Sequence, residues 1–321
     1  MNRSAVLAAA ALLVAALLWS SGTVLVRALR ESVPPMGLTF WRSVVAFVAV
    51  LPFALPGLRS QWKLARREAL RLVAAGLTGV ALFPIVLFAA IHRTEALNVG
   101  LISASEPLVI ALIAWLALGH RLGAGQVVGF VIGAAGVALI AAQGEIARLA
   151  VLTLGLGDAF VIASLYVWAV YTVLVQRLPR ELGAPVVLLA VFASGIVFAL
   201  PFALVEARHQ PIAPTPEAIT VVLYSAIFGT LLAFGCWNFG ARVLGPGRAG
   251  YFLYVIPVFT TALSVGLLGE PLRGYHGVGA AAIALGLAFA TVPFARLARL
   301  TTPVRRPKPR PRGKRDRGEA S

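Results

Sequence analysis

The chain has 321 residues, of which 60% are hydrophobic and 12% charged, and its mean hydropathy is +0.89. These values exclude a soluble globular protein and are typical of an integral membrane protein. The net charge of +16 does not indicate a nucleic-acid partner, because residues 296–321 alone hold ten of the 28 Lys and Arg residues. The single cysteine, Cys236, excludes an intramolecular disulfide and a cysteine-rich metal site.

Ten apolar runs follow one another along the chain, and each approaches the roughly 20 residues that a membrane-spanning helix needs. We therefore predict an all-α integral membrane protein with ten transmembrane helices. The first run follows Arg3 as a secretory signal would, but it continues to Val26 and nine similar runs succeed it, so we expect it to be retained. The predicted spans are residues 5–26, 35–57, 72–91, 96–118, 125–143, 152–175, 184–205, 218–240, 249–268 and 276–295.

Basic residues indicate the orientation in the membrane. With a cytoplasmic N-terminus, 21 Lys and Arg residues lie inside, six outside, and Arg42 within a span. Because cytoplasmic loops carry the excess of basic residues, we expect both termini to face the cytoplasm. The expected location is the plasma membrane of a prokaryote. The proline- and arginine-rich tail at 296–321 should be disordered and lie on anionic lipid headgroups rather than bind nucleic acid.

The first half of the sequence recurs in the second half at an offset of 149 or 150 residues. Residues 51–55 recur as 200–204, Trp19 matches Trp168, and Pro107 matches Pro257. Chance similarity between apolar helices does not place Trp, Pro and Gly in one register. We predict two five-helix units of opposite orientation, as in many secondary transporters. The expected domains are a first unit at 1–143, an external loop at 144–151, a second unit at 152–295 and the tail at 296–321.

With this repeat, the chain resembles the EamA family of the drug/metabolite transporter superfamily over about residues 7–295. The resemblance implies a carrier of small metabolites, often an exporter of amino acids or related solutes. The family usually has Glu at the position of His120, whereas Glu270 keeps the pattern. The residues that carry the resemblance are Leu18-Trp19-Ser20, Arg42, the segment from Ala96 to Leu122, the segment from Gly129 to Gly136, and the blocks Tyr254-Val255-Ile256-Pro257 and Gly269-Glu270-Pro271-Leu272.

Several kinds of chemistry are excluded. There is no GxxxxGK[ST] phosphate loop, and none of the three lysines lies in a span, which excludes an ATPase and a Schiff base. The GxGD sequence at 155–158 resembles that of intramembrane aspartyl proteases, but the only other Asp is Asp316 in the tail. We therefore expect no catalytic residue, metal or cofactor. The alternative to a transporter is a polytopic membrane enzyme or a lipid-handling protein, which would need a cluster of reactive residues at one membrane face.

Three charged residues fall within predicted spans: Arg42, Glu106 and Asp158. Each costs roughly 2.5 to 3.5 kcal/mol at the centre of a helix on insertion scales. We hypothesise that Arg42 pairs with Glu106 or Asp158 at an outward-facing cavity. The alternatives are a static pair between helices or an arginine that reaches the headgroups. Glu106, the deepest of the three, is a candidate for a functional role and for proton coupling.

The predicted substrate pathway joins these charges to prolines, hydroxyl groups and aromatic rings. Mid-helix prolines free the carbonyl four residues back, and irregular backbone in a membrane favours a water-filled path. Small polar residues could instead hold helices together, and aromatic residues could belong to the interfacial belt, where we place Trp41 and Trp115. The predicted pathway residues are Trp19, Arg42, Asn98, Ser103, Glu106, Pro107, Asp158, Trp168, Tyr171, Trp237, Asn238, Tyr251, Tyr254 and Pro257.

A close-packing face is also predicted on the fifth span, where Gly125, Gly129 and Gly133 form GxxxGxxxG. The pattern leaves open whether this face packs within one chain or joins two chains in a homodimer. The expected function is a secondary transporter that moves a small amphipathic solute by alternating access. Efflux is favoured over uptake on the resemblance alone.

Overall fold

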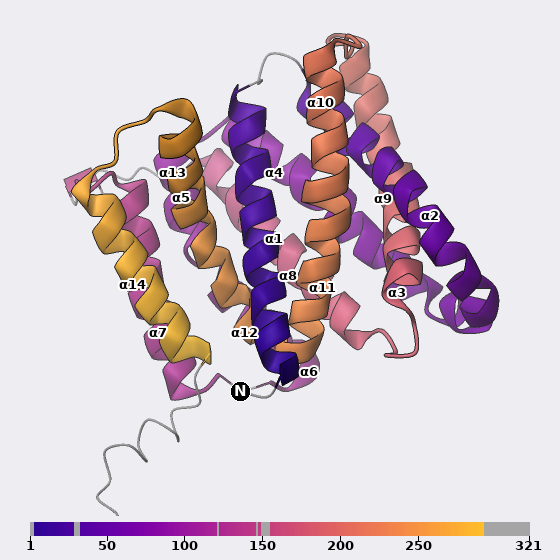
Figure 1. The fold of residues 1–321 in the computed structure, drawn as a ribbon, viewed down its shortest axis with the longest axis horizontal. Helices are drawn as coiled ribbons and strands as arrows, with labels where there is room; N and C mark the ends of the chain where they lie inside the picture. The colour runs from indigo at the N-terminus through magenta and orange to yellow at the C-terminus, as the bar shows by residue number, and fades with distance from the viewer. Residues whose placement is uncertain (1–2, 29–32, 121, 146, 149–154, 292–321) are drawn as a thin grey trace, which may run out of the picture.

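The computed structural model describes residues 3–28, 33–120, 122–145, 147–148 and 155–291, and the predicted basic tail at 296–321 lies outside them. Every regular element in the described part is helical (Figure 1). In order they are α1 (Arg3–Ala28), α2 (Pro35–Arg67), α3 (Ala69–Ala75), η1 (Gly76–Leu82), α4 (Phe83–Ile91), α5 (Ala96–Ser103), α6 (Glu106–Leu118), α7 (Ala124–Ala141), α8 (Leu156–Arg177), α9 (Ala184–Ala207), α10 (Pro216–Tyr224), η3 (Ser225–Leu232), α11 (Ala233–Leu244), α12 (Pro246–Gly250), η4 (Tyr251–Tyr254), α13 (Val255–Leu268) and α14 (Gly274–Thr291).

Nine helices within the described residues are long and apolar enough to cross a membrane, and α5 with α6 passes the same test as a pair. The chain is therefore a multi-pass membrane protein. Helices dominate because a lipid environment offers no hydrogen-bond partner to the backbone, which must satisfy itself within each segment. In Figure 1, α1 begins at the same end of the bundle at which α14 ends.

The helix α2 is longer than the span expected from the sequence. It continues from the predicted end at residue 57 to Arg67, so that the basic residues of this region lie on a helix rather than in a loop. The added residues are mostly Leu, Arg, Gln, Lys and Ala, which favour helix, and no Pro lies between Pro56 and Arg67. The 33 residues of α2 reach about 50 Å at 1.5 Å per residue.

Irregular backbone occurs at matched places in the two halves. The predicted third and eighth spans contain the π-helical segments η1 and η3. The predicted fourth span is bent by 41° between α5 and α6, and the predicted ninth contains the 3₁₀ segment η4 before α13. The helices that follow these breaks both end at a glycine with positive φ, Gly119 and Gly269. The expected irregularity near Pro107 and Pro257 is therefore present in both halves.

Helix contacts also recur between the halves. α1 packs on α11 and α13, and α8 packs on α4 and α6; α2 packs on η3, and α9 packs on η1. The central helices α1, α8 and α11 lie between an outer pair, α7 with α14, and the pair of α2 and α9 (Figure 1).

The glycine face of α7 packs against α14 of the same chain. A Cβ on Gly129 would meet the carbonyl oxygen of Gly286, and one on Gly136 would meet that of Gly279. A Cβ on Gly133 would meet the ring of Tyr254. The glycines thus serve close helix packing within one chain.

Candidate functional site

Three tryptophans from both halves of the chain form a cluster where α1, α8 and α11 meet. The ring centroids of Trp19 and Trp168 are 5.5 Å apart, and Trp237 lies 5.6 Å from each of them. Phe234 also contacts Trp19 and Trp168. Trp168 and Trp237 are buried, while Trp19 is partly buried. We call Trp19, Trp168, Tyr171, Phe234, Trp237 and Asn238 the central cluster.

Polar groups inside the central cluster connect α8 to α11. Trp168, Tyr171 and Thr172 share one face of α8 because they are three and four residues apart. The Tyr171 hydroxyl donates to Oδ1 of Asn238 at 2.8 Å, and Nε1 of Trp237 donates to Oγ1 of Thr172 at 3.3 Å. Nε1 of Trp19 donates to the carbonyl oxygen of Gly229, in η3, at 3.0 Å.

Two donors of the central cluster have no hydrogen-bond partner among the residues that the structure describes. They are Nε1 of Trp168 and Nδ2 of Asn238, on side chains that are 4% and 7% exposed. A buried donor without a partner carries a desolvation cost, so such groups in a folded protein call for an explanation. The central cluster therefore combines aromatic walls with unused donors, a combination suited to an amphipathic ligand.

A second group of predicted pathway residues lies at the break of the fourth span. The Tyr254 hydroxyl donates to the carbonyl oxygen of Ala104 at 2.8 Å. Tyr251 packs edge-on against Tyr254, and its hydroxyl donates to the carbonyl oxygen of Gln126 at 2.6 Å.

The helix α1 links the central cluster to the residues at the break of the fourth span. Oγ of Ser20, next to Trp19, donates to the carbonyl oxygen of Ile256 at 3.1 Å. Pro257 follows in the first turn of α13, Pro107 is in the first turn of α6, and Ser103 is the last residue of α5. Six predicted residues thus lie around the two breaks: Ser103, Glu106, Pro107, Tyr251, Tyr254 and Pro257.

The expected ion pair of Arg42 with a carboxylate is wrong for this structure. Both oxygens of Asp158 are already bound, one by the Thr94 hydroxyl at 2.5 Å and the other by the backbone N–H of Gly155 at 2.7 Å. The Asn98 side chain bonds Asp158 as well. No ion pair of Arg42 occurs among the described residues, and its Nε is buried without a partner.

The GxGD sequence has a structural explanation. Asp158 closes the first turn of α8 onto Gly155, and a Cβ on Gly157 would meet the carbonyl of Arg93. The carboxylate and the glycine thus hold the start of α8 against the connection between α4 and α5. Asn98 and Asp158 form a group separate from the central cluster.

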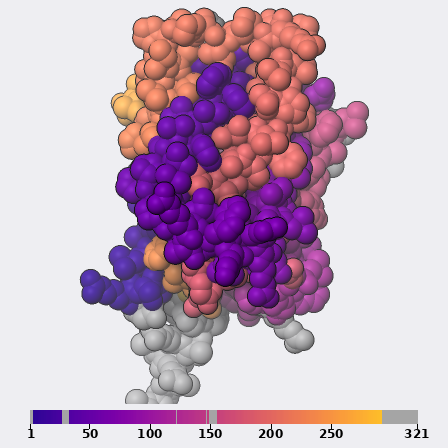
Figure 2. Space-filling model, turned by 90° about the vertical axis from the view of Figure 1, so that its right-hand side faces the viewer, coloured from indigo at the N-terminus to yellow at the C-terminus, as the bar shows by residue number. Residues whose placement is uncertain are grey.

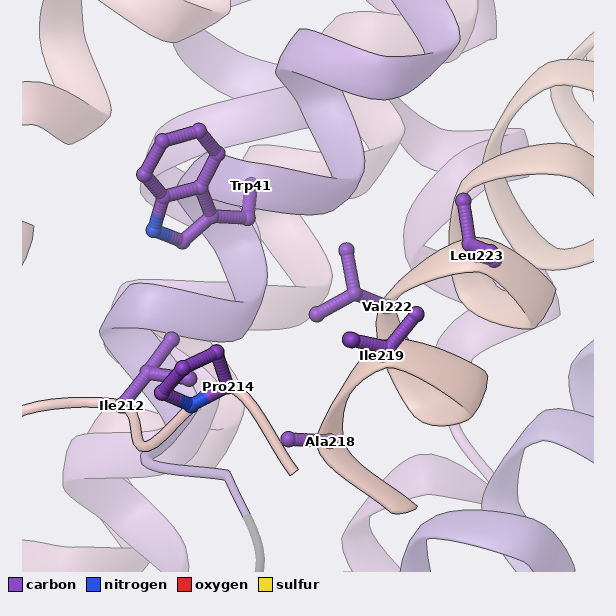
Figure 3. A pocket seen from close by; sticks show the side chains of 7 residues that line it. All are labelled: Trp41, Ile212, Pro214, Ala218, Ile219, Val222 and Leu223. Atoms are coloured by element: carbon purple, nitrogen blue, oxygen red, sulfur yellow. The ribbon is translucent and has the colours of Figure 1, made fainter. Parts of the chain in front are cut away.

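A hollow of about 260 Å³ lies apart from these groups, between the start of α2 and α10 (Figure 3). Its lining is mostly apolar and consists of Trp41, Ile212, Pro214, Ala218, Ile219, Val222 and Leu223. Figure 2 shows a face of the molecule on which purple segments of the first half lie against salmon segments of the second half. Because its described lining offers a single polar side-chain atom, Nε1 of Trp41, we do not assign the hollow to the pathway.

Sequence reasoning missed three members of the site. Phe234 is one of many apolar residues and carries no signal of its own. Thr172 is absent from the predicted pathway, although its position four residues after Trp168 places both on one helix face. The Gly229 carbonyl is reachable by Trp19 because it lies in the π-helical segment, a feature that periodicity does not reveal.

A membrane bundle with matched halves and an aromatic, donor-bearing centre is the architecture of a solute carrier. Residues 6–142 and 155–292 each match the model of the EamA-like transporter family, and the chain belongs to this family.

Relatives in several organisms are named as transporters. An "uncharacterized transporter" of Archaeoglobus fulgidus is 25% identical over 263 residues, which are 82% of this chain and 90% of the relative. YetK of Bacillus subtilis, also an "uncharacterized transporter", is 29% identical over 71% of this chain and 69% of its own. A "probable terminal-alkyne amino-acid exporter" of Streptantibioticus cattleyicolor is 27% identical over 81% of this chain and 85% of its own.

A solved crystal structure shares the fold. Its TM-score is 0.74, and the alignment covers 92% of this chain and 99% of the other at 24% identity. At this identity the likeness establishes the fold alone.

Proposed function

We propose that this protein is a secondary transporter with ten spans in two five-helix units of opposite orientation. The observation that carries the proposal is the central cluster, to which the first unit contributes Trp19 and the second contributes Trp168 and Trp237. In transporters of this architecture the substrate site lies between the two units near the middle of the membrane. The paired π-helices, the paired breaks and the recurring helix contacts support two units with one internal plan.

The proposed cargo is a small organic solute such as an amino acid or a related amphipathic compound. Aromatic walls and hydrogen-bond donors suit an apolar body that bears a polar group better than a bare ion. The name of the relative in Streptantibioticus cattleyicolor supports an amino-acid-like solute and an outward direction. Alternating access would open the central cluster to each side of the membrane in turn, and it is closed to solvent here, with Tyr171 and Trp237 at most 1% exposed.

The proposed location is the prokaryotic plasma membrane with both termini in the cytoplasm. The common end at which α1 begins and α14 ends is consistent with an even number of crossings. The basic residues of α2, among them Arg66 and Arg67, would lie on the cytoplasmic side.

Counterflow in liposomes tests the function. Purified protein is reconstituted into vesicles loaded with unlabelled amino acids, and uptake of each labelled amino acid is followed. We expect saturable exchange of at least one solute, lost on Trp168→Ala and kept on Trp41→Phe, which lies outside the central cluster. Vesicles that exchange no solute while the protein turns over a lipid or a peptide would overturn the proposal.

A further inference from the structure

The central cluster departs from the internal repeat at one hydrogen bond. Trp19 and Trp168 are matched positions, and so are Gly229 and Gly79, at offsets of 149 and 150. Trp19 donates its N–H to the Gly229 carbonyl, yet the corresponding bond from Trp168 to Gly79 is not formed, and Nε1 of Trp168 has no partner in the described part of the chain. The two indoles are thus matched in sequence but not in hydrogen bonding.

Tyr171 distinguishes the two halves here. Its ring lies against Gly79, where an added Cβ would meet three ring carbons. The residue that corresponds to Tyr171 in the first half is Gly22, which has open space around it. In the first half nothing on α1 can cover Gly229 as Tyr171 covers Gly79, so the Gly229 carbonyl stays available to Trp19.

Asn238 is a second departure from the repeat. Its matched residue in the first half is Phe88, so a buried amide stands where the other unit has an apolar ring. The Tyr171 hydroxyl donates to Oδ1 of Asn238 and thereby orients the amide, whose Nδ2 remains unpartnered. Because the first unit builds the same local fold with Gly22 and Phe88, the fold itself does not require Tyr171 and Asn238.

The unused donors share one environment. The Trp168 ring lies 5.0 Å from the Tyr171 ring and 5.6 Å from that of Trp237, the residue before Asn238. An indole N–H only donates, and an amide NH₂ only donates, so both groups need acceptors. Each buried donor without a partner raises the free energy of the protein, because it has lost its hydrogen bonds to water. A ligand that supplies an acceptor recovers that free energy.

We propose that Trp168 and Asn238 form a recognition subsite for a hydrogen-bond acceptor group of the transported solute, a carboxylate or a carbonyl. The apolar body of the solute would lie against the rings of the central cluster. This inference rests on the proposed transport function and identifies the acceptor group as the part of the solute that the second unit binds. Neutral N–H groups can donate to a carboxylate or to a carbonyl, and the experiment below distinguishes the two.

Binding to detergent-purified protein tests the subsite, measured as the ligand-induced rise in melting temperature over a range of concentrations. The probes form two series, L-leucine, L-leucinamide and 3-methylbutylamine, and L-phenylalanine, L-phenylalaninamide and 2-phenylethylamine. Within a series the body is constant and only the amine lacks an acceptor. We expect the acid or the amide of at least one series to bind at least tenfold more tightly than its amine.

Three variants separate recognition from packing. Trp168→Phe and Asn238→Leu each remove an unused donor and should lower the ratio of acid or amide affinity to amine affinity about tenfold. Trp19→Phe removes an N–H that is already bonded to Gly229. It should alter the binding of acid, amide and amine alike and so keep their ratio. Melting of each variant without ligand verifies that it is folded.

The possible outcomes separate this inference from the transport proposal. Equal binding of acid, amide and amine overturns the subsite, and so does a ratio that survives Trp168→Phe and Asn238→Leu, or a failure of all six probes to bind at millimolar concentration. If the liposomes still exchange a solute in any of these cases, the transport proposal stands without the subsite. Absence of exchange together with lipid or peptide turnover overturns both.

Discussion

The Tyr254 hydroxyl donates at 2.8 Å to the carbonyl oxygen of Ala104, which lies 150 residues earlier, at the offset that relates the two halves of the chain. Ala104 lies in the break of the fourth span, where Pro107 interrupts the helical hydrogen bonds. One side chain of the second half thus satisfies a carbonyl at the corresponding break of the first half.

We expect Tyr254→Phe to destabilise the protein by about 1–3 kcal/mol, because it leaves the Ala104 carbonyl buried without this donor. Thermal unfolding in detergent measures the effect. Tyr166→Phe is the matched control, since Tyr166 is 41% exposed. Equal melting temperatures for the two variants would show that the hydrogen bond does not stabilise the break.

Gly129→Ala should separate α7 from α14. The new methyl group would lie 2.9 Å from the backbone nitrogen of Ala290, and neither backbone can yield without moving a helix. Overpacking of this kind typically costs about 1–3 kcal/mol. Gly277→Ala, on α14 with open space around it, should be neutral or slightly stabilising. A melting temperature unchanged in Gly129→Ala would contradict the close packing.

Asp158→Ala should lower stability rather than solute affinity. The change removes the acceptor for Thr94 and for the Gly155 N–H, and loss of such a capping carboxylate costs about 0.5–2 kcal/mol. The control is Glu217→Ala, because Glu217 is also in the first turn of its helix, α10, but is exposed. Unchanged melting with weakened solute binding would instead return Asp158 to the substrate pathway.

Glu106→Gln tests proton coupling at the break of the fourth span. If the carboxylate exchanges a proton during transport, the variant should lose the pH dependence of counterflow between about pH 5 and 8 while it remains folded. Glu95→Gln, an exposed position just before α5, is the control and should keep the wild-type profile. Normal transport by Glu106→Gln across this range would exclude a proton-carrying role.

Much of the helical architecture could be predicted from the sequence, because apolar runs in a membrane have few structural alternatives. The pairing of Trp19 with Trp168 across the halves was also readable, since both keep one register in the repeat. Contacts between distant segments could not be predicted from the sequence. Thr94 lies 64 residues before Asp158, and nothing in the sequence marks it as the group that occupies that carboxylate.

The interpretation of Arg42 was wrong for a related reason. A charge inside a span predicts a partner, but it does not say which carboxylates are already occupied by local hydrogen bonds. The unused donor of Trp168 was equally hidden, because the sequence match with Trp19 predicts equal bonding. The covering of Gly79 by Tyr171 becomes visible only when the two halves are compared in space.

The π-helical segment η3 places the Gly229 carbonyl that accepts the hydrogen bond of Trp19. In a π-helix each carbonyl bonds the N–H five residues on rather than four, so a π turn holds more residues than an α-helical turn. Deleting one residue within residues 225–232 would let the segment relax to an α-helix and would change the hydrogen bonding of the Gly229 carbonyl. Trp19 would then lose the geometry of its bond, although every aromatic and polar side chain of the central cluster would still be present. Single-residue deletions in η3, which barely change composition or hydropathy, are therefore expected to alter solute binding at the central cluster.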